Sequence, residues 1–465
     1  MEGRGQKISK DNYRQKRRTA SKSDTGVQTY IGITDNQLTE VQFTEEKQME
    51  QILSPTNLNR AYKQVERNKG VGGVDKMETK ELLSYLQQHK EELIESLYKG
   101  TYRPNPVRRV EIPKDNGKKR QLGIPTVIDR FVQQAIFQIL SPQYEKEFSE
   151  NSYGFRPGRN VHQAIRQSQV YINEGYIYGV DIDLERFFDT VNQSKLIEIV
   201  SRKVKDGRVV SLIHKYLRAG VMKGLSYEES LEGVPQGSPL SPLLSNIMLN
   251  ELDKELEERG HRFVRYADDG LLFSRSKRAA ERIKSSIGSF IEKKLYLKVN
   301  EEKTHVGLVT EMKFLGYSFY KHKEEYRIRL HPKSAQKMKK RLKEITSRSN
   351  GMSITERKTA LVKYIRGWME YFKLADMKGI LQATDSWLRR RLRMCIWKSW
   401  KQAKTRIRNL IRCGVAKSRA REASYTRRSY WCMSKHPAVH EAISTKNLRR
   451  AGYPFLSDYY RKVAS

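Results

Sequence analysis

The spacing of apolar residues predicts a chain that mixes helices and strands up to about residue 330 and contains helices alone beyond it. Apolar positions at helical spacing indicate helices over 57–68, 79–98 and 129–148, and another that starts within 233–256. Short apolar runs flanked by turn residues indicate two strands within 107–125 joined by an Asn-Gly turn, a strand running into a helix over 176–191, and a strand ending at 313–319. Such a mixture is typical of an α+β protein.

One stretch, VRYADDGLLF at residues 264–273, places two acidic residues inside an apolar run. Strand formers flank Asp-Asp-Gly, which predicts a tight hairpin because Gly270 and an Asp before it tolerate positive φ. Asp268 and Asp269 are therefore expected at or beside the hairpin tip. Because two adjacent carboxylates repel each other, they need a cation, a basic partner or bulk water. A solvated turn is the ordinary interpretation of this tripeptide alone.

A second acidic strand changes that interpretation. In GVDIDLERFFD, residues 179–189, Asp181 and Asp183 alternate on one strand face, and Asp183 lies where the strand ends. A carboxylate there can meet the hairpin tip across a sheet. Three converging carboxylates indicate a divalent-metal site, because Mg²⁺ binds a few carboxylates together with phosphate oxygens. Two such ions clamp an in-line phosphoryl displacement, so the chemistry is nucleotidyl transfer by a polymerase or a nuclease.

The composition points to a polyanionic partner. The 465 residues include 90 Lys and Arg against 53 Asp and Glu, which gives a formal net charge of +37. We expect a soluble, intracellular protein, because no run of 18 apolar residues occurs and the N-terminus lacks the apolar block of a signal peptide. The 3 cysteines are widely spaced, which excludes a disulfide framework and favours free thiols in a reducing compartment.

Most of the excess charge lies near the C-terminus. Residues 331–465 hold 34 Lys and Arg against 8 Asp and Glu, and so contribute 26 of the 37 net positive charges. Aromatic residues are interleaved there, as in DSWLRRRLRMCIWKSWK at 385–401, a mixture that suits phosphate contacts and stacking on unpaired bases. Helical spacing over 361–400 favours a mainly structural role for the tryptophans, namely Trp368, Trp387, Trp397 and Trp400.

Six sequence blocks occur in a fixed order: VRRVEIPKDNGKKRQLGIPTVIDR, SYGFRPGR, DIDLERFFD, GVPQGSPLSPLLSNIMLNELD, RYADD and KFLGYSF. Together they resemble the reverse transcriptase domain of group II intron-encoded proteins, the intron maturases. RGWMEYFKLADMKGILQATDSWLRRRLR resembles the thumb or maturase domain of that family. The similarity runs from about residue 55 to the C-terminus and is far more specific than YADD alone.

The resemblance implies a right-hand polymerase with fingers, a palm built on an antiparallel sheet, a helical thumb and a basic helical C-terminal segment. We expect a flexible extension over 1–50, fingers and palm over 51–330, a thumb or maturase (X) domain over 331–404, and a basic DNA-binding tail over 405–465. The paired cysteines of an HNH endonuclease are missing, so the resemblance is to the bacterial type that lacks this domain.

The resemblance also assigns the metal site. It implies that Asp183 and Asp268 bind two Mg²⁺ ions, or Mn²⁺ in their place, while Asp269 supports the site and the backbone carbonyl of Leu184 supplies a further oxygen. Asp181 lies on the same strand face, but the spacing to Phe-Phe-Asp matches the metal ligand at 183. We therefore interpret Asp181 as a structural neighbour of the ligands.

Contacts to the incoming nucleotide follow from the same resemblance. Lys114 and Arg120, around the KDNGKKR turn, are expected to grip the triphosphate of a dNTP, and Gln236 in PQG to contact the nucleotide or the nascent pair. Phe188 takes the position that stacks under the sugar and excludes a 2′-hydroxyl, which favours deoxynucleotides over ribonucleotides.

The function implied by the resemblance is RNA-dependent DNA synthesis combined with splicing and retrohoming of a group II intron. The expected partners are the intron RNA, an RNA template with a DNA primer, target DNA and dNTPs, in a nucleoid-associated ribonucleoprotein of the bacterial cytoplasm. Two alternatives remain open: a splicing cofactor whose catalysis is dispensable, and a domesticated reverse transcriptase with a host or defence role. The intact acidic cluster argues against the first, and the maturase-like thumb and basic tail argue against the second.

Overall fold

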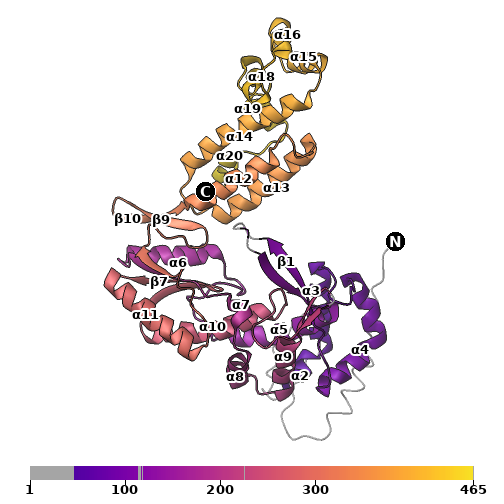
Figure 1. The fold of residues 1–465 in the computed structure, drawn as a ribbon, viewed down its shortest axis with the longest axis vertical. Helices are drawn as coiled ribbons and strands as arrows, with labels where there is room; N and C mark the ends of the chain where they lie inside the picture. Colours follow the sequence, from indigo (N-terminus) through magenta and orange to yellow (C-terminus); the bar gives the residue numbers. More distant parts are fainter. Residues whose placement is uncertain (1–46, 114–116, 118, 225, 464–465) are drawn as a thin grey trace, which may run out of the picture. The chain divides into compact units, whose positions relative to one another are not determined.

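The computed structural model describes residues 47–113, 117, 119–224 and 226–463, and it divides into two compact units (Figure 1). The first unit comprises the described residues of Met1–Pro157, Ile182–Gly260 and Ser285–Thr304. The second comprises Gly158–Asp181, His261–Lys284 and the described residues of His305–Ser465. Each unit therefore combines segments that are distant in the sequence. The mixture of sheets and helices confirms the predicted α+β class.

The first unit is mainly helical around one small sheet. Its elements are α2 (Gln48–Ile52), α3 (Pro55–Asn68), η2 (Thr79–Glu81), α4 (Leu82–Tyr98), β1 (Val107–Pro113), β2 (Lys119–Ile124), α5 (Val127–Glu145), α7 (Phe187–Thr190), α8 (Gln193–Lys203), α9 (Gly207–Arg218), β4 (Val221–Lys223), β5 (Ser226–Glu228) and α10 (Ser241–Glu258). The sheet has the order β2-β1-β4-β5. The expected helices at 57–68, 79–98, 129–148 and after 233 are all confirmed, with ends shifted by a few residues.

The predicted strand pair at 107–125 is also confirmed. β1 and β2 are antiparallel, with a register that runs from Arg108↔Ile124 to Pro113↔Lys119. β1 pairs with β4 in parallel, although the two strands are more than 100 residues apart in sequence. Residues 114–116 and 118, and with them Lys114 and the Asn of the expected turn, lie outside the described residues.

Helix α3 shows how capping and a buried amide fix local structure in the first unit. The Ser54 side chain accepts a hydrogen bond from the Asn57 N–H at 3.4 Å, and Pro55 supplies the first helical residue. The buried side-chain amide of Asn57 donates to the carbonyls of Ile52 and Ala135, both at 2.9 Å. Because Ala135 lies on α5, this amide joins α3 to its main packing partner.

The second unit combines a four-stranded sheet, a hairpin and a set of C-terminal helices. Its elements are α6 (Val161–Asn173), β3 (Tyr178–Ile182), β6 (Arg262–Tyr266), β7 (Asp269–Ser274), α11 (Lys277–Lys294), β8 (His305–Leu308), β9 (Tyr317–His322), β10 (Glu325–Leu330), α12 (Pro332–Ile345), α13 (Ile354–Phe372), α14 (Lys378–Ser399), α15 (Ala403–Arg412), α16 (Lys417–Tyr425), α17 (Tyr430–Met433), α18 (Pro437–Ala442), α19 (Thr445–Arg450) and α20 (Leu456–Val463). The unit boundary falls within β3 and α11. Only helices follow residue 330 in the described chain, as the apolar spacing predicts.

The four-stranded sheet has the order β6-β7-β3-β8. β6 and β7 form an antiparallel hairpin, and β3 is antiparallel to β8. β3, β6 and β7 are largely buried, with the side chains of Val180, Val264 and Leu271 at most 1% exposed, whereas the edge strand β8 is half-buried to exposed. Within the described residues, no helix combines the length and the apolar character needed to cross a membrane.

Helix α14 is the centre of the C-terminal helices. It packs against α17, α18 and α20, all of which come from beyond residue 404 (Figure 1). The buried Asp385 side chain accepts hydrogen bonds from the Leu456 and Ser457 N–H groups, each at 2.8 Å, and so caps the start of α20. Buried Arg393 donates to the Ile443 carbonyl at 2.9 Å. Residues after 404 therefore cover α14 and are part of its packing.

The tryptophans of this region differ in burial. Trp397 is 1% exposed and belongs to the core, as the helical spacing predicts. Trp368, Trp387 and Trp400 keep part of their surface accessible. A purely structural role is thus established for Trp397 alone.

The first testable prediction concerns Asp385. Replacing it by Ala removes the acceptor of two buried N–H groups at the start of α20, and leaving such groups unpaired costs about 1–3 kcal/mol. We expect Asp385→Ala to lower the apparent free energy of unfolding by about that amount and to speed amide hydrogen exchange at Leu456 and Ser457. Ser386→Ala, at an exposed position of the same helix, is the matched control. Unchanged exchange at 456 and 457 would show that Asp385 does not hold α20.

Candidate active site

The adjacent aspartates lie at and beside the tip of a hairpin, as predicted. Tyr266 and Asp269 are the last register pair of β6 and β7, so Ala267 and Asp268 form the two-residue tip. Ala267 has φ +57°, whereas Gly270 lies inside β7 opposite Arg265 and has no positive φ. The tolerance of Gly270 for positive φ favoured a hairpin here, but the turn does not use it. A positive φ at the first tip residue is what a type II′ turn requires.

Sequence analysis did not identify the buried arginine that supports this tip. Arg265 is 3% exposed, and its guanidinium donates to the Ala267 carbonyl at 2.9 Å. This hydrogen bond connects Ala267, which has a positive φ, to Arg265 of the preceding strand β6. Asp268 is thus confirmed at the hairpin tip, and Asp269 is the first residue of β7.

The second acidic strand places Asp181 and Asp183 in different surroundings. Asp181 lies in β3 opposite His305 of β8, and its carboxylate is 4.0 Å from the His305 Nδ1. Asp183 follows β3 by one residue, and its Oδ2 lies 2.6 Å from the Nζ of Lys303. The Asp183 N–H donates to the Thr304 hydroxyl at 3.1 Å. The carboxylate of Asp183 therefore already faces one positive charge.

Lys303 and Thr304 are contacts that sequence reasoning missed. They are about 120 residues from Asp183, in the polar segment NEEKTH, where no apolar spacing singles out one lysine. The pairing of β3 with β8 and the local bridge between 184 and 299 bring these segments together.

The bridge between 184 and 299 also fixes the backbone around Leu184. Its two hydrogen bonds run from Asn300 N–H to Asp183 O and from Glu185 N–H to Lys298 O, both at 2.8 Å. The Leu184 carbonyl takes no part in these two hydrogen bonds, and its role as a metal ligand stays a prediction. The Leu184 side chain is 8% exposed and belongs to the core.

Across the described residues, no group of three or more His, Cys, Asp or Glu side chains is gathered closely enough to hold a metal ion. Asp183 belongs to the first unit, and Asp268 and Asp269 belong to the second. The chemical nature of the predicted donors, carboxylate and carbonyl oxygens, suits a hard divalent cation.

The loop before α10 is attached to the backbone of Phe188. Val234 N–H donates to the Phe188 carbonyl at 2.6 Å, and Gly233 N–H donates to the Val191 carbonyl at 2.8 Å. Gly233 has φ +85°, and a Cβ at this position would lie 2.7 Å from the Phe188 oxygen, so only glycine fits. The Phe188 side chain is partly exposed and meets Phe187 edge to face at a centroid distance of 5.2 Å.

The same loop is attached to β2 at its other end. The Gly123 N–H donates to the Gln236 carbonyl at 2.8 Å, and Ser241 donates to the Pro235 carbonyl at 2.6 Å. Arg120, exposed on β2, lies three residues before Gly123. The structure therefore connects three predicted nucleotide contacts, Phe188, Gln236 and Arg120, through one loop of the first unit.

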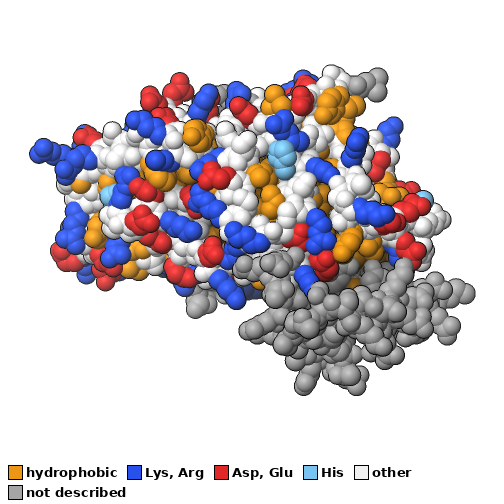
Figure 2. Space-filling model, turned by 90° about the horizontal axis from the view of Figure 1, so that it is seen from below, with side chains coloured by type: hydrophobic (Ala, Val, Ile, Leu, Met, Phe, Trp, Pro, Cys, Tyr) orange, Lys and Arg blue, Asp and Glu red, His pale blue; other side chains and the backbone are white. Residues whose placement is uncertain are grey.

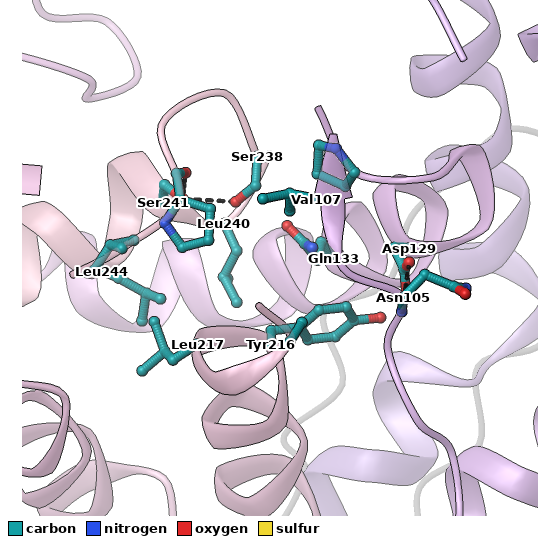
Figure 3. Close-up of a pocket in the computed structure, with 14 residues that line it drawn as sticks. Asn105, Val107, Asp129, Gln133, Tyr216, Leu217, Ser238, Leu240, Ser241 and Leu244 are labelled. Carbon is teal, nitrogen blue, oxygen red and sulfur yellow. Dashed lines mark hydrogen bonds between the residues drawn. The ribbon is translucent and has the colours of Figure 1, made fainter. Parts of the chain in front are cut away.

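A small, mainly apolar pocket lies beneath this loop (Figure 3). Ser238 and Ser241 share a hydrogen bond of 2.6 Å on the loop side, and Asp129 and Gln133 of α5 also line the pocket. Its volume of about 10 Å³ is room for a single water, which excludes a nucleotide. We interpret the pocket as packing that supports the loop.

Asp129 is the buried acidic residue among those that line this pocket. Its carboxylate accepts hydrogen bonds from the Tyr102 hydroxyl at 2.7 Å, the Thr126 hydroxyl at 2.6 Å and the Asn105 N–H at 3.2 Å. Burial raises the pKa of Asp129 above the ordinary aspartate value, while the three hydrogen bonds act in the opposite direction. The net direction is upward.

Surface charge outside these contacts is mixed. On the face in Figure 2, Lys and Arg side chains are interspersed with Asp and Glu and do not form one continuous patch. This face has no charge pattern of its own that would mark a binding surface.

Comparisons with known proteins identify two regions of the chain. Residues 112–319 match the family described as reverse transcriptase (RNA-dependent DNA polymerase). Residues 335–414 match the family described as the maturase-specific domain of group II introns. The two regions follow each other along the chain.

Curated relatives agree with these matches. The chain is 36% identical over 297 residues to the protein YkfC of Escherichia coli (strain K12), covering 55% of this chain and 77% of that protein. It is 32% identical over 337 residues to the group II intron-encoded protein LtrA of Lactococcus lactis subsp. cremoris, covering 57% of this chain but only 55% of the relative. A chain of a solved partial Cas6-RT-Cas1–Cas2 complex is 26% identical, with a TM-score of 0.35, covering 60% of this chain and 46% of that one.

The second prediction concerns the support beneath the loop. Asp129→Asn replaces one accepting oxygen by an NH₂ that faces at least one of the three donors, so we expect a loss of about 1–3 kcal/mol in the free energy of unfolding. Urea unfolding of the variant and of Asp75→Asn, an exposed aspartate of the same unit, measures the difference.

The pH dependence of that difference has a defined sign. Because burial raises the pKa of folded Asp129 above the unfolded value of about 3.9, the folded state binds the proton more tightly. The stability of the wild type relative to Asp129→Asn should therefore be greatest below that value and fall as the pH rises through the folded-state pKa. A difference that grows with pH would contradict the upward shift.

Proposed function

We propose, from the premise that this chain belongs to the family of group II intron-encoded reverse transcriptases and maturases, that it is an RNA-directed DNA polymerase that also assists splicing. In this proposal the protein binds its intron RNA, promotes splicing, and copies the intron into cDNA during retrohoming. The observation that carries the proposal is the succession of a reverse transcriptase region and a maturase-specific region on one chain. A simple polymerase would not need the second region.

We place the chemistry at Asp183, Asp268 and Asp269. β3 and β7 are neighbours in one sheet, Asp183 follows β3, and Asp269 opens β7.

The donor set fits divalent cations, which the reverse transcriptase family generally uses. Asp183 and Asp268, with the Leu184 carbonyl, would hold two Mg²⁺ ions, and Asp269 would support them. Bound there, the ions would supply the Lewis acidity and positive charge that in-line attack by a primer 3′-hydroxyl requires. The Lys303 ammonium lies beside the Asp183 carboxylate and so offsets its negative charge.

The nucleotide contacts follow from the loop of the first unit. Arg120 on β2, together with Lys114, would bind the triphosphate, and Gln236 would contact the incoming nucleotide. The Phe188 ring is partly exposed, and its backbone carbonyl accepts a hydrogen bond from the Val234 N–H. The backbone of Phe188 is therefore fixed, which positions the ring to contact the sugar of a bound nucleotide. A ring in that place would collide with a 2′-hydroxyl and favour dNTPs.

Nucleic-acid binding is assigned to the helices after residue 330. Intron RNA, primed template and target DNA are the proposed partners of their excess positive charge, within a ribonucleoprotein of the bacterial cytoplasm.

A splicing cofactor without polymerase activity is the second candidate. The ion pair between Lys303 and Asp183 favours it, because a carboxylate committed to a lysine is a weaker metal ligand. The two candidates differ in a single measurable activity, the synthesis of cDNA.

Substituting the hairpin aspartate tests that activity. Asp268→Asn keeps the size of the side chain and removes its charge, so we expect cDNA synthesis on a primed RNA template with Mg²⁺ to fall to background while RNA affinity stays within about twofold, since one charge changes few phosphate contacts. Asp376→Asn, at an exposed position, is the matched control. Wild-type extension by Asp268→Asn would reject the metal assignment, and no extension by the wild type would favour the splicing cofactor.

Sugar selection gives an independent test. Phe188→Ala and Phe188→Val remove the ring, and we expect the preference for dNTP over rNTP, measured as the ratio of kcat/KM values, to fall by about tenfold to a hundredfold. Tyr98→Ala, which truncates an exposed aromatic of the same unit, should leave the ratio unchanged. A preserved ratio in both Phe188 variants would place the selection at another residue.

A further inference from the structure

A cavity of about 480 Å³ opens on the C-terminal helices, and nothing in the proposed polymerase site uses it. It is lined by Lys343, Arg348, Trp387, Arg391, Met394 and Trp431. These residues come from the end of α12, the segment after it, α14 and the start of α17, all within the second unit. Its volume falls in the range of small-ligand sites.

The lining combines three cations with two indole rings. Among the described residues that line the cavity, none is acidic. Cations beside exposed aromatic rings are the combination with which proteins hold unpaired nucleotides, because the ring stacks on a base and the cation contacts its phosphate. An acidic peptide would need the cations but not the rings.

One wall of the cavity is rigid before any ligand arrives. The Arg391 guanidinium donates to the Thr346 hydroxyl at 2.6 Å and to the carbonyls of Lys343 and Thr346 at 3.0 and 2.9 Å. The guanidinium carbon lies 5.2 Å from the centroid of the Trp387 ring. Trp387 is thereby fixed against the end of α12, so little side-chain entropy is lost when a base stacks on it.

The second indole is fixed in a similar way. The guanidinium carbon of Arg390 lies 3.7 Å from the centroid of the Trp431 ring, and the same guanidinium donates to the Trp431 carbonyl and to the Ser434 hydroxyl. Trp431 remains partly exposed, in contrast to the fully buried Trp397. Each of the two partly exposed tryptophans that line this cavity has an arginine guanidinium against its ring. Packing alone does not require this arrangement.

The remaining cations lie at the mouth. Lys343 and Arg348 are exposed, and the Arg348 backbone is held by Lys398, whose ammonium donates to the Arg348 carbonyl at 2.6 Å. Both side chains can reach the backbone of a strand whose base enters the cavity.

We infer that this cavity binds an unpaired nucleotide of a single strand, with the base stacked on Trp387 or Trp431 and the adjoining phosphates on Lys343 and Arg348. The inference rests on the proposed nucleic-acid-binding function and names a site for it. The site joins the maturase-specific region, which ends at 414, to Trp431 beyond it. Both parts of the C-terminal region therefore contribute to one contact.

The test measures the affinity of the full chain for fluorescently labelled oligouridylate, for the same strand with its bases removed, and for oligodeoxythymidylate. We expect Trp387→Ala and Trp431→Ala each to weaken binding of oligouridylate by about 5- to 150-fold, the range for loss of one stacked base. The loss should vanish on the abasic strand, and the slope of log affinity against log salt should stay unchanged because no charge is removed.

The cations give the complementary result. Lys343→Gln and Arg348→Gln should each reduce the salt slope by about 0.7 on both the normal and the abasic strand. A loss of similar size on oligodeoxythymidylate would identify the ligand as any unpaired nucleotide, and a loss confined to oligouridylate would identify it as RNA.

Two controls separate binding from folding. Trp368→Ala truncates a partly exposed tryptophan of α13 outside the cavity and should keep wild-type affinity. Trp387→Phe and Trp431→Phe keep an aromatic face and should recover most of the binding, with thermal unfolding recorded for every variant.

The outcomes are distinguishable. Wild-type affinity in both Ala variants, or an equal loss on the abasic strand, overturns the stacking site but leaves the proposed function intact. An acidic peptide that instead binds tightly would compete with oligouridylate on the wild type but not on the Ala variants. That result would overturn the nucleotide site and identify the cavity as a site for a protein partner. If the wild type binds neither oligouridylate nor oligodeoxythymidylate, both the site and the proposed nucleic-acid-binding function are overturned.

Discussion

The attachment of the loop over 233–241 to two other segments is the constraint on which the candidate nucleotide site depends. Its backbone is bonded to Phe188 at one end and to Gly123 of β2 at the other. Because Gly233 approaches the Phe188 oxygen too closely for a side chain, the attachment tolerates little displacement. Phe188, Gln236 and Arg120 therefore share one frame, although each belongs to a different part of the sequence. The buried Asp129 network below the loop keeps that frame in place.

Charge in this protein has structural as well as binding roles. Residues 331–465 carry most of the net positive charge, yet several of their arginines are used internally. Arg357 and Arg393 are 6% and 5% exposed, and both donate to backbone carbonyls. Burial lowers the pKa of Arg393, but guanidinium remains charged in proteins. The exposed cations are thus fewer than the count of basic residues suggests, which makes individual positions such as Arg348 more informative than the total.

The packing of α14 changes how the C-terminal segment is to be understood. Residues beyond 404 form helices that cover α14, one of which is capped by Asp385 of α14, and they contribute Trp431 to the cavity. Removing them would expose apolar surface of α14 and confuse loss of contact with loss of folding. Single substitutions at exposed positions therefore separate binding from stability more cleanly than truncation does.

The sequence by itself determined the α+β class, the family, most helices and the two hairpins at 107–125 and 264–273, because apolar spacing and turn residues act over a few neighbouring positions. It did not determine the hairpin tip. The Asp-Asp-Gly signal indicated a hairpin without giving its two tip residues, and the register that pairs the buried Val264 with Leu271 places the turn at Ala267 and Asp268. It also did not determine the contact of Lys303 with Asp183 or the grouping of Trp387 with Trp431. These pairs are separated by tens of residues or more, and only tertiary packing brings such side chains together.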